Sequence, residues 1–168
     1  MSVLTLDGKK ETRPLLTTAF TEGPADLSPD GRWLAYQQSD GAGRREIYIS
    51  PFPDVGSKRR LVSLGTQPVW AQNGRELFYI AASGMLTSVT IRTSPEPGVV
   101  SSAELFSTKQ YFSASQGRSY DVWPDRQRFL FIKDAPGADR SLPDNATRGS
   151  LVVVLSWVEE LKARVAKN

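Results

Sequence analysis

Aspartate side chains are the residues of this sequence best suited to acid–base or metal chemistry. Asp26 and Asp121 each lie four residues before the aspartate of a turn, which is Asp30 in one case and Asp125 in the other. Paired carboxylates can hold a calcium ion or exchange protons with a substrate. Capping of the turns already accounts for Asp30 and Asp125. Asp26 and Asp121 therefore remain as candidates, with an ordinary polar position on an inner strand as the alternative.

The sequence contains no histidine and no cysteine. These absences exclude Ser-His-Asp and Cys-His catalysis, zinc hydrolase sites, thiolate metal sites and disulfides. A protein-kinase site is excluded as well, because its His-Arg-Asp sequence and its phosphate-binding glycine loop are missing. We therefore expect a protein that is not an enzyme, with no catalytic residue, no cofactor and no metal. Because a chain without cysteine suits both the cytosol and the periplasm, the compartment stays open.

The charged residues do not predict a nucleic-acid partner. The chain has 21 basic and 18 acidic residues, and the two kinds are interspersed. Two basic runs, at residues 44–45 and 58–60, could bind phosphate, but the second lies at the start of an outer strand, where positive charge discourages edge-to-edge aggregation. No aromatic residues interleave with either run to stack on bases. We expect no nucleic acid and, since no apolar stretch is long enough, no membrane insertion.

One short segment occurs three times, each time as a turn between two strand-forming stretches. Asp30, Asn73 and Asp125 occupy the same place in the three copies, so the spacing is about 43 residues and then about 52. A four-stranded β-propeller blade takes about 40–45 residues. Glycine follows the turn residue in two copies, but Arg126 replaces it in the third. Either Arg126 adopts a left-handed conformation, at a cost of about 1–2 kcal/mol, or that turn differs.

Each copy predicts antiparallel strands, and the chain is predicted to be all-β. Beyond the hairpins, third strands are predicted at residues 46–50, 86–92 and 151–157, and fourth strands at residues 60–64 and 100–106. Two further strands, at residues 3–6 and 13–17, precede the first copy. Ser156 begins a capping box, and an apolar stripe follows it, which predicts a short C-terminal helix. The predicted organisation of residues 1–168 is about three four-stranded sheets of a partial β-propeller: outer strands of a preceding blade at 1–20, blades at 21–64 and 65–108, an incomplete blade at 109–157 and the helix at 157–167.

These segments resemble a known family of repeats. The Ser-Pro-Asp-Gly turn at residues 28–31, with Trp-Leu-Ala-Tyr at 33–36 and Glu-Ile-Tyr-Ile at 46–49, is similar to TolB-like (WD40-like, PD40) β-propeller repeats. The ending at residues 152–162 resembles the C-terminal blades of propellers attached to bacterial serine/threonine kinases. The resemblance covers nearly all of the chain. It implies a ring of six or more blades, of which this chain supplies the last three without the kinase.

The predicted function is a non-catalytic binding or scaffolding module. A protein partner or a small ligand is expected at the mouth of the propeller channel, on the loops that enter the innermost strands. The candidate contact residues there are Glu22, Asp26, Thr66, Gln67, Arg118 and Asp121. One alternative is the gating or sensor portion of a propeller-containing enzyme, a serine peptidase or a serine/threonine kinase, whose catalytic domain is absent. Another is a purely structural fragment with no ligand.

The two ends of the chain predict self-association. Three blades do not close a ring, because known propellers have about four to eight. The predicted strands at residues 3–6 and 13–17 are surplus, whereas the third copy lacks a fourth strand. A homodimer related by a two-fold axis would close a six-bladed ring.

Overall fold

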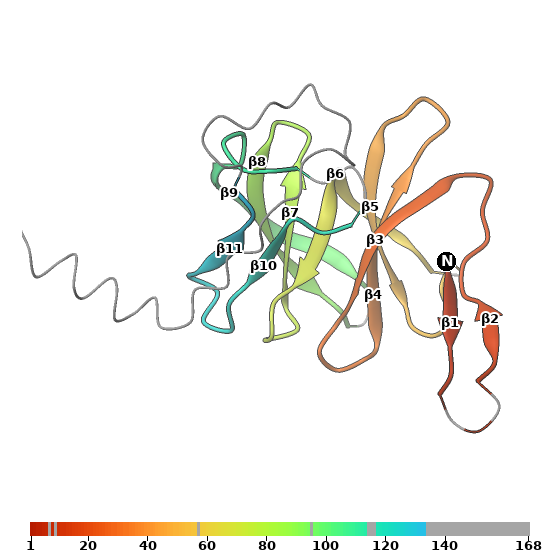
Figure 1. Cartoon of the computed structure of the whole chain (residues 1–168). Helices are drawn as coiled ribbons and strands as arrows, with labels where there is room; N and C mark the ends of the chain where they lie inside the picture. Colours follow the sequence, from red (N-terminus) through yellow and green to blue (C-terminus); the bar gives the residue numbers. More distant parts are fainter. Residues whose placement is uncertain (7, 9, 57, 95, 114–116, 134–168) are drawn as a thin grey trace, which may run out of the picture. The chain divides into compact units, whose positions relative to one another are not determined.

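The chain folds into antiparallel β-strands, and no helix occurs in the part that the structure describes (Figure 1). The computed structural model of the chain describes residues 1–133, apart from residues 7, 9, 57, 95 and 114–116. The all-β prediction is confirmed for that part. The predicted strand at 151–157 and the predicted helix at 157–167 lie outside the described residues. No segment that could cross a membrane as a helix is found within residues 1–133 as described.

Eleven strands are present among the described residues. Most of them coincide with stretches rich in branched and aromatic residues, which favour the pleated conformation. The predicted third strands at 46–50 and 86–92 are β5 and β8, each longer by a residue or two. The strands are β1 Ser2–Leu4, β2 Thr12–Pro14, β3 Thr21–Leu27, β4 Trp33–Ser39, β5 Arg45–Pro51, β6 Arg60–Trp70, β7 Glu76–Ala81, β8 Met85–Arg92, β9 Gly98–Ser107, β10 Tyr120–Val122 and β11 Phe129–Phe131.

One open sheet contains the strands from β3 to β9 in sequence order, with β3 and β9 at its edges. Its middle strand, β6, pairs with two different strands along two different parts of its length. Residues 60–64 pair with β5, whereas residues 65–70 pair with β7. We call β3, β4, β5 and the first part of β6 the first ladder, and the second part of β6 with β7, β8 and β9 the second ladder. Each ladder thus has four strands, and the pairing changes between residues 64 and 65 within one continuous strand.

The two ladders share an irregularity at the start of their first strands. The register shifts between Glu22 and Ala25 in β3, and between Thr66 and Val69 in β6. Gln67 lies within the second shift and has a positive φ of 56°. A β-bulge at matching places is a recurring local feature, and it bends each strand as it enters its ladder.

Both faces of the first ladder are covered, so buried residues follow one another along its strands. In β4, Leu34 and Tyr36 pack with Leu16, next to β2, while Ala35 packs with residues of the second ladder. A strand buried on both faces reads as a continuous apolar run rather than an alternating one. This is why the sequence 33–36 lacks the polar alternation of a half-exposed strand.

Three apolar clusters lie between successive layers. The first joins the β1–β2 hairpin to the first ladder, the second joins the two ladders, and the third joins the second ladder to the β10–β11 hairpin. Their buried members are Leu16, Leu34 and Tyr36 in the first; Ala35, Ile47, Ile49, Trp70, Leu77, Tyr79, Val89 and Ile91 in the second; and Val69, Ala71, Phe78, Leu86 and Tyr120 in the third.

The three repeated turns have the geometry that their sequences predict. Gly31 and Gly74 have φ values of 69° and 65°, and Arg126 has 61°. The left-handed alternative predicted for Arg126 is therefore the one observed. The side-chain oxygens of Asn73 and Asp125 each accept two backbone N–H groups of the following residues, which confirms turn capping at these positions.

Candidate functional site

Three of the predicted contact residues lie together beside β3 and β10. Arg118, which precedes β10, donates from Nη1 to Oδ1 of Asp26 on β3 at 3.4 Å. Its Nη2 lies 3.9 Å from Oδ1 of Asp121 on β10. The side chains are 38% exposed for Arg118, 26% for Asp26 and 60% for Asp121. The guanidinium therefore lies between the two carboxylates, where a bound cation would otherwise have to be.

Asp26 also connects the two ladders directly. Its Oδ2 accepts a hydrogen bond of 2.7 Å from the backbone N–H of Trp70 on β6. Burial raises the pKa of the Asp26 carboxyl above its usual value, and the Trp70 N–H and the Arg118 guanidinium oppose that rise. Because both oxygens of Asp26 are engaged within the protein, the more exposed carboxylate of Asp121 is the better placed of the two to meet a ligand.

The structure places Gln67 inside the protein rather than at its surface. Its side-chain oxygen accepts hydrogen bonds of 2.8 Å from both the backbone N–H and the hydroxyl of Ser119. Its backbone carbonyl accepts a bond of 2.9 Å from the Tyr120 hydroxyl, and its N–H donates to Gln37 at 3.3 Å. With 2% of its surface exposed, Gln67 holds three successive repeats together and compensates for its left-handed backbone.

Glu22 lies apart from the Arg118 cluster. Its carboxylate accepts a hydrogen bond of 2.6 Å from the Thr18 hydroxyl and lies 3.6 Å from the amino group of Met1. Thr18 in turn accepts a bond of 3.0 Å from the side-chain amide of Gln38. Glu22 therefore belongs to a polar cluster beside the first ladder, and its side chain is only 16% exposed.

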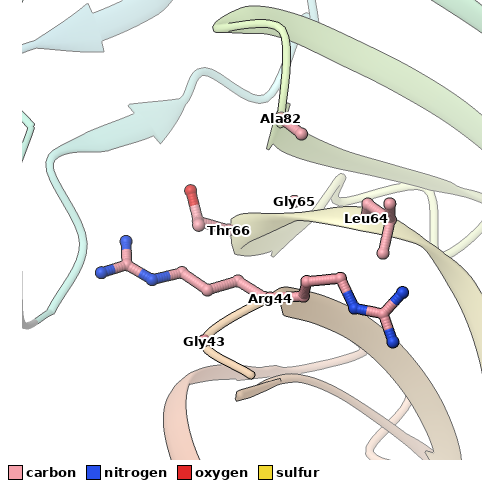
Figure 2. Close-up of a pocket in the computed structure, with 7 residues that line it drawn as sticks. Gly43, Arg44, Leu64, Gly65, Thr66 and Ala82 are labelled. Carbon is pink, nitrogen blue, oxygen red and sulfur yellow. The ribbon is translucent and has the colours of Figure 1, made fainter. Parts of the chain in front are cut away.

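Thr66, the remaining candidate, borders a shallow hollow of about 280 Å³. Figure 2 shows Arg44 of the β4–β5 loop on one side of this hollow and Leu64, Gly65 and Thr66 of β6 on the other, with Ala82 beyond them. The full lining is Gly43, Arg44, Arg45, Leu64, Gly65, Thr66 and Ala82. We call this feature the β6 hollow.

The basic run at residues 58–60 is largely committed to contacts within the protein. The Arg59 guanidinium lies 4.7 Å above the ring of Tyr48 and donates to the side-chain oxygen of Gln38 at 2.8 Å. Arg60 forms an ion pair of 3.0 Å with Glu96. These contacts favour the structural interpretation of this run over a phosphate-binding one.

Sequence reasoning did not predict that Gln37, Ser119 and Tyr120 bind Gln67 at the bend of β6. Burial raises the pKa of the Tyr120 hydroxyl well above its usual value, which agrees with a protonated hydroxyl that donates to the Gln67 carbonyl. A signal was present in the repeat itself, because Ser119 and Gln67 occupy equivalent places about 52 residues apart.

The described residues offer hydrogen-bonding and charged groups at this place. Within the described residues, no three acidic side chains come close enough to form a metal site. Arg118, Asp26 and Asp121 present one guanidinium and two carboxylate groups beside β3 and β10, which suits recognition of polar or charged groups by hydrogen bonds. The chain matches no protein-family model and no curated protein.

Proposed function

We propose that the chain is a run of TolB-like β-propeller blades that binds a protein partner or a small ligand without catalysing a reaction. The observation that supports this best is the meeting of three repeats at their inner strands. Asp26 of β3, the Trp70 N–H of β6 and Arg118 before β10 are joined by direct hydrogen bonds. In a propeller the inner strands surround the channel, where ligands bind.

The layered packing supports the assignment of each ladder to one blade. Each ladder has four antiparallel strands, and both of its faces are covered by apolar clusters. The repeated turns at Asp30 and Asn73 give the period of a blade. By this assignment β1–β2 are outer strands and β10–β11 are inner strands of blades that the described residues do not complete.

A photo-crosslinking experiment tests where the partner binds. A benzophenone amino acid replaces Asp121 in one variant and Ser102, on the outermost strand β9, in a second variant. Both positions are exposed, so both side chains tolerate replacement. After irradiation in extracts of the source cells, we expect one adduct of defined mass from position 121 and none from position 102. Adducts from position 102 alone, or from neither position, would contradict a protein partner at β10 and leave the small ligand as the form of the proposal to test.

A further inference from the structure

The β6 hollow lies where the two ladders meet, at the end from which their inner strands start. Its walls come from the β4–β5 loop, the bend of β6 and the turn between β7 and β8. The glycine in its floor is required by packing, because a Cβ on Gly65 would lie 2.6 Å from the carbonyl oxygen of Ile80. Because β6 and β7 approach so closely, no side chain can stand at position 65, and the surface there remains hollow.

Two arginines line the hollow, and within the described residues one of them, Arg45, has no acidic partner. Arg44 is held by Asp40, with Nε 2.6 Å from Oδ2 of that carboxylate. The nearest acidic residue along β5, Glu46, accepts the Tyr48 hydroxyl at 2.7 Å. Arg45 is exposed and forms no ion pair or hydrogen bond through its side chain with any residue that the structure describes. A guanidinium at a hollow, free to bind, favours an anionic ligand.

The size of the hollow and its single available guanidinium favour a carboxylate over a phosphate as the bound anion. The hollow has a volume of about 280 Å³ and is open to solvent, unlike the clefts that bury most of a small-molecule ligand. It suits one or two side chains. A phosphate carries nearly two negative charges and is commonly bound by several cations, whereas Arg45 is the one basic side chain without a partner among the described residues that line the hollow. A single carboxylate matches one guanidinium, and Leu64 and Ala82 offer apolar contact to the methylene groups that carry it.

We propose that the β6 hollow binds an acidic side chain of a protein partner, with Arg45 neutralising the carboxylate and the Thr66 hydroxyl donating a hydrogen bond to it. This inference rests on the proposed function, since it names the chemistry of the partner at the end of the propeller where binding is proposed. The Thr66 hydroxyl makes no hydrogen bond within the described part of the chain, so it is available as a donor.

An NMR titration tests this inference on the full chain. The ¹⁵N-labelled protein is titrated with an acetylated and amidated hexaglutamate peptide, and the amide signals of Gly43, Gly65 and Ala82 are followed. We expect saturable shifts at these three residues and affinity that falls as salt is added. Arg45→Gln should weaken binding about tenfold. Ala82→Glu, at an exposed position, should weaken it comparably by placing a carboxylate in the hollow.

Three comparisons make the result decisive. Arg92→Gln is the matched control, because Arg92 is exposed at the opposite end of its strand, and it should change the affinity less than twofold. Equal weakening by Arg45→Gln and Arg92→Gln would overturn the inference. So would binding of a hexaglutamine peptide as tight as that of hexaglutamate, or saturation of the same amides by inorganic phosphate at lower concentration. If position 121 gives crosslinks but hexaglutamate does not bind, the proposed function stands and only the inference of an acidic side chain in the hollow is rejected.

Discussion

A single carboxylate connects three repeats in this protein. Asp26 belongs to β3, accepts the N–H of Trp70 on β6 and pairs with Arg118 before β10. Asp121 occupies the equivalent place in the third copy, yet within the described part of the chain its carboxylate accepts the N–H of its own neighbour, Val122, at 2.9 Å and otherwise faces Arg118. The two aspartates are alike in sequence context and differ in what they hold together.

This difference predicts unequal effects of the two alanine variants. Asp26→Ala leaves the buried N–H of Trp70 without an acceptor, so the free energy of unfolding should fall by about 1–3 kcal/mol. Asp121→Ala removes only solvent-exposed contacts and should change it by no more than about 0.5 kcal/mol. Urea denaturation of the two variants at one protein concentration measures both values. Equal losses would mean that Asp26 does not join the ladders.

At the scale of elements, the turns show what local sequence determines. The Pro-Asp-Gly and Gln-Asn-Gly turns place glycine at a positive φ, and the third copy forces Arg126 into the same conformation. Arg126 gains an ion pair with Glu76 in return. The imperfect copy thus keeps the geometry of the turn by tolerating strain.

Paired variants at position 126 separate the backbone strain from the ion pair. Both Arg126→Gly and Arg126→Ala lose the contact with Glu76, but only alanine keeps a Cβ at positive φ. The glycine variant should therefore be more stable than the alanine variant by about 1 kcal/mol, as measured by thermal or urea unfolding. Gly31→Ala is the companion variant, because a Cβ at Gly31 would meet no atom within 4 Å. Its loss of about 1 kcal/mol would come from φ alone; no difference between glycine and alanine at either position would argue against strain.

Local sequence patterns predicted the hairpins, but they could not predict the contacts between residues of different repeats. The strands around Asp30 and Asn73 follow from turn chemistry and branched residues within a few positions. The burial of Gln67 depends on Gln37, 30 residues away, and on Ser119, 52 residues away. Its place at the start of an inner strand had suggested a contact surface, and the structure buries it instead. Arg118 and Asp26, which are 92 residues apart, were expected near one channel mouth from topology, but their direct contact was not predicted.

At the scale of the whole molecule, the described chain has incomplete edges. The β1–β2 and β10–β11 hairpins have only two strands each, and each packs on one ladder. Large apolar side chains are exposed on both hairpins or next to them, among them Leu4, Leu6, Leu130 and Ile132. Exposed apolar residues gathered at unpaired strands are common sites of association.

We predict that two copies associate and that the N-terminal strands of each contribute to the interface. Light scattering or analytical ultracentrifugation should find a dimer of the 168-residue chain. Deletion of residues 1–18 should disrupt it, because this removes β1 and β2. A well-folded monomer at micromolar concentration would contradict the prediction and show that these edges are covered in another way.

The continuity of β6 has a consequence for how the protein comes apart. The first part of β6 is the last strand of the first ladder and its second part is the first strand of the second ladder, without a loop between them. Its release would remove hydrogen bonds from both ladders at once, so the two lose their order together rather than one after the other. The shared strand makes a chain of repeated units behave, in unfolding, as one cooperative body.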